Sequence, residues 1–466
     1  MNAIPPNVPT PSMPSGLLHN RAFLLLWMGQ GISNVGDVVF DTTLMLWIAT
    51  TMMPRYSWAP LALSGVLIAA VLPMLLIGPV AGTFVDRWEK RRTMLVADAS
   101  RALLILLLVL FTMVAPLTAN ADSSALTFHL GMVYAIVFLA GAAAQFFTPA
   151  RLVLMTDTVA ESSRPQAVAM GQLTQALAIV IGPAIAAVLL FSEGVAWALL
   201  VNALSFAVSF ATILGVQSET PEHAVGQHEA WQREFKDGLR FFASNHTLRT
   251  VLVAVCIAMV GGGALSGLNI FFVTENLHTS SRYYGVAGMI VGVGSMAGTV
   301  LASLTVRRLG LSRMLWLSMV LTGCLVIVYS RLTSFVPALV VLFVLSMPNV
   351  AINVVISPLM LRVTPRPMMG RVASVLNPTI SIANVIALAG AGLLASTVLS
   401  DFHGTLLGVR FGPVDTIFTG AGLLVIIGGL YAACQQLDRP MKVDAAEPAR
   451  TTIAPDAPHA LSQQAG

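Results

Sequence analysis

The chain has 466 residues, of which 56% are hydrophobic and 10% are charged, whereas soluble domains carry about 25% charged residues. Too few polar side chains remain to cover a core in water, so the composition excludes a soluble globular protein. The net charge of +4 is spread over many short loops rather than gathered on one domain, and we therefore expect no nucleic-acid partner.

Twelve apolar segments follow one another along the chain, and each is long enough to cross about 30 Å of hydrocarbon as a helix. The sequence therefore predicts an all-α membrane protein with twelve transmembrane helices. We expect these helices at roughly 22–50, 59–84, 93–116, 128–155, 165–191, 195–216, 248–274, 283–306, 312–331, 334–362, 370–398 and 413–435.

The longest polar stretch, residues 217–247, divides these helices into two groups of six. Within it, Trp231, Phe235, Leu239 and Phe242 recur at helical spacing with charged residues between them. This pattern predicts an amphipathic helix on the membrane surface. The expected organisation is a tail, a six-helix bundle, this linker, a second six-helix bundle and a tail, with both tails disordered: residues 1–20, 21–216, 217–247, 248–435 and 436–466.

Lys and Arg are distributed unequally between the two sides of this arrangement. One side receives Arg87, Lys90, Arg91, Arg92, Arg164, Arg233, Lys236, Arg240, Arg307, Arg308, Arg313, Arg366 and the C-terminal tail. The other side receives Arg55, Arg282, Arg331 and Arg410. Basic loops stay in the cytoplasm, so we expect a multi-pass protein with both termini cytoplasmic.

The segment that follows the second apolar stretch reads G-T-F-V-D-R-W-E-K-R-R, from Gly82 to Arg92. It resembles the signature loop of the major facilitator superfamily, although Glu89 stands where the family usually has a second Gly. The resemblance implies a cytoplasmic gate loop containing Gly82, Asp86, Arg87, Lys90, Arg91 and Arg92. Gly82 is expected to let two helices approach closely, Asp86 to pair with a basic group or a helix N-terminus, and the basic cluster to anchor at anionic headgroups. A loop that only sets orientation is the alternative.

Three further motifs are similar to the efflux branch of this superfamily, which includes macrolide and siderophore exporters. They are W-M-G-Q-G-I-S-N-V-G-D at Trp27–Asp37, F-F-T-P-A-R at Phe146–Arg151 and M-G-R-V at Met369–Val372. The resemblance implies two six-helix bundles related by a pseudo-twofold axis and a location in a bacterial inner membrane. Gly182-Pro183 matches only part of an efflux signature, so import by the same fold stays open.

The first predicted helix carries two acids, Asp37 and Asp41, four residues apart and therefore on one face. Gln30 and Asn34 extend this polar face. Ionisable groups inside a bilayer are costly, so the face should line a water-filled cavity, where a carboxylate could bind a proton in one conformation and release it in another. For Asp37, a role in helix packing is the alternative.

Other helices carry polar residues that could face the same cavity or bond between helices. These substrate-cavity candidates are Gln172, Gln175, Asn349, Asn353, Asn377 and Asn384. Asp98, Arg101 and Arg151 lie near the predicted cytoplasmic helix ends, where we expect them to belong to the gate.

The chain lacks a P-loop and an H-E-x-x-H motif, and its three cysteines form no CxxC pair, so we expect no metal, cofactor or enzymatic activity. The best hypothesis is a proton-coupled secondary exporter, a monomer among membrane lipids, working by alternating access. No Lys or Arg is expected in mid-span, which favours small neutral or cationic amphipathic substrates. Alternatives are an importer, a lipid or siderophore transporter, a non-transporting sensor and a lipid-modifying enzyme.

Overall fold

The computed structural model describes residues 17–54, 56–115, 123–216, 231–365, 368–400, 402, 404–406 and 409–435. Within these residues, twelve helical segments are long and apolar enough to cross a membrane. Except for the second, which ends at Leu76 instead of 84, they begin and end within about five residues of the predicted segments, and the predicted fold class is confirmed. Residues 1–16, 217–230 and 436–466, which hold most of both predicted tails and the first part of the predicted linker, lie outside the described residues.

Within the described residues, the N-terminal half contains seven α-helices, and all but the short α3 are long enough to span a membrane. They are α1 (Arg21–Trp47), α2 (Ala59–Leu76), α3 (Gly78–Arg87), α4 (Lys90–Val114), α5 (Ser123–Asp157), α6 (Arg164–Ser192) and α7 (Val195–Leu214). A π-helical turn, Ile48–Met52, prolongs α1. The stretch predicted as one helix over 59–84 is broken at Ile77, because Pro79 has no backbone N–H to continue the ladder.

The C-terminal half begins with α8 (Trp231–Ser244), which docks on α13 where Gly238 lies against the Arg371 carbonyl. The six spans follow: α9 (His246–Phe271), α10 (Tyr284–Leu309), α11 (Leu311–Ser330), α12 (Phe335–Val363), α13 (Met369–Leu393) and α14 (Pro413–Cys434). Two π-helical turns, Phe272–Asn276 and Leu394–Val398, prolong α9 and α13. An antiparallel hairpin of β1 (Gly404–Leu406) and β2 (Val409–Phe411), which the sequence did not predict, precedes α14.

The first span of each half starts in the same way. The Asn20 side chain accepts a hydrogen bond from the Phe23 amide at the start of α1, and Asn245 does the same for Leu248 at the start of α9. Such caps satisfy a backbone N–H that has no partner inside the helix. The two halves therefore have equivalent entry points.

The packing of the two halves follows one pattern. In the N-terminal half α1 packs on α6 and α7, α4 on α5 and α7, and α2 on α5. In the C-terminal half α9 packs on α13 and α14, α11 on α12 and α14, and α10 on α12. Each pair in the first set has its counterpart in the second, which is the arrangement expected of two bundles related by a pseudo-twofold axis.

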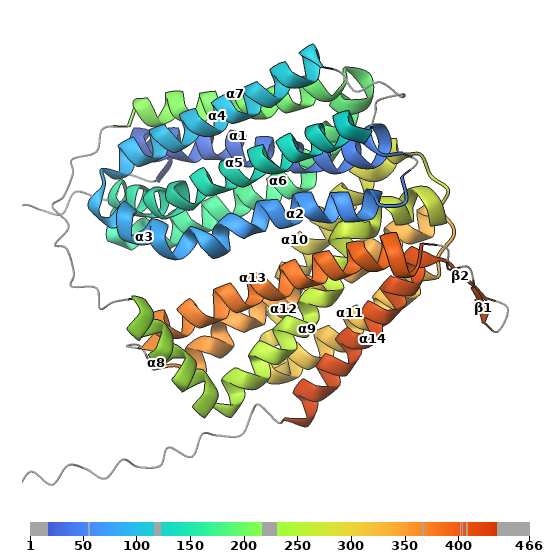
Figure 1. Ribbon diagram of the computed structural model, residues 1–466. Helices are drawn as coiled ribbons and strands as arrows, with labels where there is room; N and C mark the ends of the chain where they lie inside the picture. The colour runs from blue at the N-terminus through green and yellow to red at the C-terminus, as the bar shows by residue number, and fades with distance from the viewer. Residues whose placement is uncertain are drawn as a thin grey trace, which may run out of the picture.

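The halves meet through α2 with α13 and through α6 with α10. Glycines make the closest contacts: a Cβ at Gly292 would lie 2.8 Å from the Val180 Cα, and one at Gly392 would lie 2.4 Å from the Ser64 Oγ. Figure 1 shows the halves close together on the right, where α2 begins, and diverging on the left, at α3 and α8. We call these the closed end and the open end.

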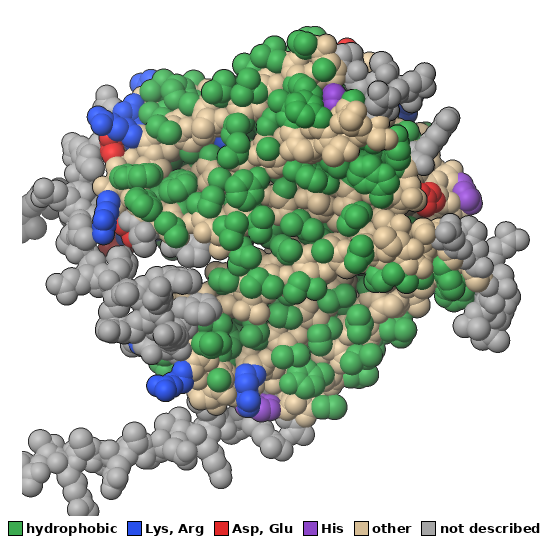
Figure 2. All heavy atoms as spheres, viewed as in Figure 1, with side chains coloured by type: hydrophobic (Ala, Val, Ile, Leu, Met, Phe, Trp, Pro, Cys, Tyr) green, Lys and Arg blue, Asp and Glu red, His purple; other side chains and the backbone are tan. Residues whose placement is uncertain are grey.

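The flank of the molecule is apolar, as a bilayer requires. In Figure 2 hydrophobic side chains cover both halves between the two ends, and most Lys and Arg side chains on view lie at the open end. Large exposed side chains include Leu103 and Leu110 on α4 and Leu304 on α10. This band of exposed apolar residues is the surface that lipid tails would cover.

Candidate functional site

One face of α1 packs tightly on α7. Gly29 and Gly36 lie on this face and let α1 approach α7 so closely that a Cβ at either would lie about 2 Å from a hydroxyl there, at Thr212 or Ser205. The polar face lies beside it, and its first residue, Gln30, also reaches α7. The polar face changes in exposure along the helix. Gln30 is buried, Asn34 and Asp37 are half-buried, and Asp41 is exposed.

A cavity of about 120 Å³ lies beside this face, between α1, α5 and α6. Its apolar wall includes Leu26, Trp27 and Met155. Its polar wall is formed by Gln30, Asn34, Arg151, Gln172 and Gln175. The structure thus brings together four residues predicted to line the central cavity, two from α1 and two from α6. Asp37 and Asp41 do not line this cavity and lie one and two turns farther along α1, towards the closed end.

Arg151 has a different position from the one expected. It was predicted to belong to a gate at the end of a helix, but α5 continues to Asp157, so Arg151 lies nearly two turns inside the helix and lines the cavity. The expectation of a cavity without a fixed cation is therefore wrong. A guanidinium offers planar hydrogen bonding to carboxylates and other anions.

A buried polar network connects the cavity to α4. The Gln30 Nε2 donates to the Ser209 Oγ at 3.1 Å, and the Ser209 hydroxyl donates to the Asp98 Oδ2 at 2.6 Å. Asp98 in turn forms an ion pair with Arg101. Sequence reasoning missed Ser209, although Asn202, Ser205 and Ser209 lie on one face of α7 at helical spacing and could have indicated a polar contact.

Asp98 and Arg101 are not gate residues at the membrane surface. Because α4 begins at Lys90, they lie two to three turns inside the span, where they are 0% and 5% exposed. The Arg101 guanidinium lies 4.4 Å from the ring centroid of Phe147 and 4.3 Å from that of Phe206. Cation–π contacts of this kind stabilise a charge that has left water, so the pair belongs to the packing core of the N-terminal half.

The candidates in the C-terminal half are not part of the 120 Å³ cavity. Asn349, Asn353 and Asn377 are exposed, and Asn384 is half-buried. The Asn377 carbonyl accepts a hydrogen bond from the Ser381 hydroxyl. Asn349 and Asn353 lie on α12, and Asn377 and Asn384 lie on α13.

The signature segment is mostly helical rather than a loop. Gly82 to Arg87 form the end of α3, Trp88 and Glu89 form the turn, and Lys90 begins α4. A Cβ at Gly82 would meet nothing within 4 Å, so Gly82 is not at a close helix contact in this open-end conformation. The expectation of close packing there is wrong for this state.

The basic residues of this segment are largely held by backbone carbonyls. Arg91 donates to the Ile213 and Leu214 carbonyls at the end of α7, at 3.2 and 2.8 Å. The Lys90 ammonium donates to the carbonyls of Asp86 and Trp88. These bonds cap helix ends, where carbonyls lack intrahelical partners, and they fasten the α3–α4 turn to α7.

Two equivalent six-helix halves that meet at one end and enclose polar side chains between apolar flanks define a membrane transporter rather than an enzyme. The chain belongs to the Major Facilitator Superfamily, whose sequence model matches residues 27–388. It is a multi-pass membrane protein.

The relatives of the chain agree with this assignment. It is 21% identical to the MFS-type transporter YkuC of Bacillus subtilis (strain 168), over 88% of this chain and 91% of that protein. It is 24% identical to macrolide efflux protein A of Streptococcus pyogenes, over 36% of this chain and 37% of that protein. The fold is also similar to a bacterial homologue of the iron transporter ferroportin in its inward-facing state, with a TM-score of 0.71, 14% identity, and coverage of 91% of this chain and 100% of that one.

Proposed function

We propose that this chain is a proton-coupled exporter that moves small amphipathic compounds out of the cell by alternating access. The observation that carries the proposal is the polar face of α1. Its Gln30 and Asn34 line a cavity together with Gln172 and Gln175, and the same face continues to Asp37 and Asp41. One helix therefore connects a polar cavity to two acids within the bilayer.

The two acids provide the coupling. Asp37 and Asp41 are one helical turn apart, so their carboxylates repel each other when both are charged, and a proton on one removes that repulsion. A conformation that encloses this face favours the protonated form, and one that opens it to water favours the charged form. Substrate and proton can then bias the same exchange between two states.

The cavity chemistry indicates the kind of substrate. Leu26, Trp27 and Met155 offer an apolar wall, and the amides of Gln172 and Gln175 offer donors and acceptors. An amphipathic compound that is neutral, or that carries a cation directed towards Asp41, fits these groups. The exposed amides Asn349, Asn353 and Asn377 would form the opposite wall, since polar side chains in mid-span are unfavourable against lipid.

Transport of an anion, such as a siderophore, is the second candidate, and Arg151 favours it. This guanidinium lines the cavity beside Gln172. An anionic group bound there would gain charge-assisted hydrogen bonds. A lipid substrate or import by the same fold remains an alternative outcome of the experiment below.

The orientation follows from the basic residues. The open end carries most Lys and Arg on view in Figure 2, so we place it and both termini in the cytoplasm of a bacterial cell, with the protein in the inner membrane. In this orientation the cavity receives its substrate from the cytoplasm. Likeness to macrolide efflux protein A also favours export.

The test is proton release from the purified full chain in detergent, titrated with lipophilic cations and, separately, with organic anions. We expect a cation to release protons from the wild type, and we expect Asp41→Asn to abolish that release. Glu161→Gln, which changes an exposed acid in the 3-10 turn before α6, is the matched control and should behave as wild type. Cation binding without proton release contradicts the coupling, and binding of anions alone favours the second candidate. Uptake into inverted vesicles under an imposed proton gradient then gives the direction.

A further inference from the structure

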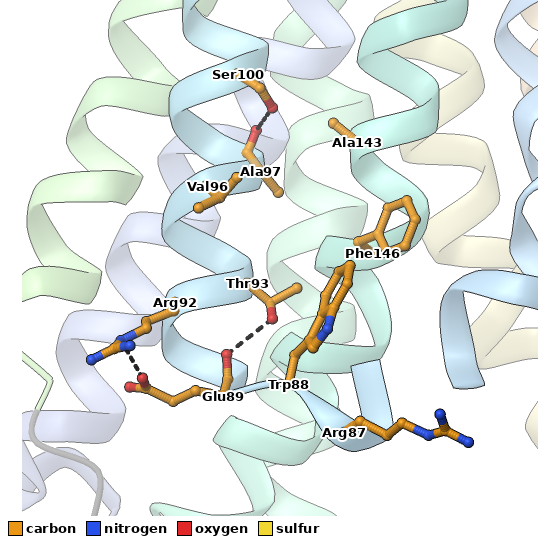
Figure 3. A pocket seen from close by; sticks show the side chains of 10 residues that line it. All are labelled: Arg87, Trp88, Glu89, Arg92, Thr93, Val96, Ala97, Ser100, Ala143 and Phe146. Carbon is orange, nitrogen blue, oxygen red and sulfur yellow. Dashed lines mark hydrogen bonds and ion pairs between the residues drawn. The ribbon is translucent and has the colours of Figure 1, made fainter. Parts of the chain in front are cut away.

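A second and larger cavity, of about 550 Å³, lies outside the transport site, between α4 and α5 beside the α3–α4 turn (Figure 3). Its apolar wall includes Val96 and Ala97 of α4 and Ala143 and Phe146 of α5. It reaches from Trp88 to Ser100, which along a helix is roughly 18 Å at 1.5 Å per residue. We call it the α4–α5 groove.

The groove opens towards lipid rather than towards the cleft between the halves. Val96 is 69% exposed, and it belongs to the same face of α4 as Leu103, Leu107 and Leu110, which are also exposed. The charged residues of α4 that take part in the core, Asp98 and Arg101, are buried on another face. The groove is therefore continuous with the apolar flank that lipid tails cover.

Trp88 fixes the depth of the groove in the membrane. Its ring stacks on Phe146 with the centroids 5.8 Å apart, and it is 48% exposed. Tryptophan is enriched at the headgroup level of bilayers, where one part of the ring meets apolar surface and another meets water. The groove thus runs from the headgroups into the hydrocarbon.

The mouth of the groove is positively charged. Arg87 and Arg92 line it together with one acid, Glu89, which pairs with Arg92 at 2.5 Å. Two guanidinium groups against one carboxylate leave the mouth with a charge of +1. The side chain of Arg92 is 82% exposed, so its guanidinium group can contact a lipid phosphate without any change in the backbone of α4. Guanidinium groups bind phosphates through paired, charge-assisted hydrogen bonds.

We propose that the α4–α5 groove binds an anionic phospholipid of the leaflet at the open end. The phosphate lies at the exposed Arg92 guanidinium, and one acyl chain runs between Val96 and Ala143. Figure 3 shows the Arg87 side chain on the other side of Trp88, where it adds positive charge to the mouth without touching the same phosphate. This site is separate from the transport cavity and does not depend on the proposed transport activity. Zwitterionic lipid without preference, or detergent alone, is the competing occupant.

The experiment measures tryptophan quenching by bromine on the lipid acyl chains. The full chain is reconstituted in phosphatidylcholine vesicles that contain either dibrominated phosphatidylglycerol or dibrominated phosphatidylcholine. The quenching that depends on Trp88 is obtained by difference from Trp88→Phe. We expect the anionic lipid to bind about fivefold more tightly at this position, from one net basic charge near the surface.

Two variants test the groove itself. The double substitution Arg87→Gln/Arg92→Gln removes both guanidinium groups and should abolish the preference. Val96→Phe fills the groove from an exposed position that packing does not constrain, and it should reduce Trp88-dependent quenching by both lipids. The control Arg307→Gln/Arg308→Gln removes two exposed basic residues at the same end, outside the groove, and should keep the preference.

Each alternative result contradicts the proposal. Equal quenching by both lipids in the wild type excludes an anionic preference. A preference that survives in Arg87→Gln/Arg92→Gln excludes the guanidinium groups as its cause, and one that is lost in the Arg307/Arg308 control indicates general attraction to the surface instead of a site. If the double variant fails to fold, Val96→Phe decides: unchanged quenching excludes an acyl chain in the groove.

Discussion

The ion pair between Asp98 and Arg101 gives the sharpest prediction for stability. The two side chains are 0% and 5% exposed, so Asp98→Asn leaves a guanidinium charge buried without its carboxylate. Removing one partner of a buried ion pair costs about 3–5 kcal/mol, because the remaining charge cannot return to water. The Phe147 and Phe206 rings keep their contacts and do not replace the lost charge.

The assay is the free energy of unfolding of the purified protein in detergent, followed by circular dichroism during denaturant titration. We expect a loss of about 3–5 kcal/mol for Asp98→Asn and recovery of most of it in Asp98→Leu/Arg101→Met, where apolar groups replace the whole pair. Glu161→Gln, an exposed substitution, should stay within about 0.5 kcal/mol of wild type. A stable Asp98→Asn protein, or a double variant as unstable as the single one, would refute the reasoning.

Three further predictions concern the two ends. Gly292→Val places a Cβ 2.8 Å from a backbone atom of α6, so it should separate the halves and increase maleimide labelling of a Ser64→Cys reporter. The control Gly82→Val places a Cβ that meets nothing within 4 Å, and it should leave labelling unchanged. Equal labelling of the two variants would contradict the close packing at Gly292. The exposed Cys434 at the open end should react with a membrane-impermeant maleimide in inverted vesicles but not in intact cells, and the reverse result would overturn the orientation. Arg331→Met removes hydrogen bonds to α14 and a contact with β2, and it should lower the free energy of unfolding by about 1 kcal/mol; no measurable change would show that this tie contributes nothing.

Apolar segments predicted the twelve spans well because a helix that crosses a bilayer must be long and must form its backbone hydrogen bonds internally. The break at Ile77 was not foreseen, since the apolar run continues through it and hides the effect of Pro79. The β1–β2 hairpin was also missed. Its strands have three residues each, too few for an alternating pattern to stand out.

The candidate site was predictable on one helix and less so between helices. The face of α1 from Gln30 to Asp41 follows directly from helical spacing. The positions of Arg101 and Arg151 within their spans were misjudged because each depends on where a helix begins or ends, and both helices extend farther than their apolar cores. The contact of Gln30 with Ser209 joins residues 179 positions apart, and spacing within one helix cannot reveal such a neighbour.

The two halves share a packing plan but not a distribution of charge. Within the described spans of the N-terminal half, charged side chains lie well inside the membrane at Asp37, Asp41, Asp98, Arg101 and Arg151. In the described spans of the C-terminal half, Lys, Arg, Asp and Glu occur only near the helix ends. Equivalent scaffolds have thus become specialised. In the proposed mechanism the N-terminal half supplies the groups that exchange protons, and the C-terminal half presents uncharged amides.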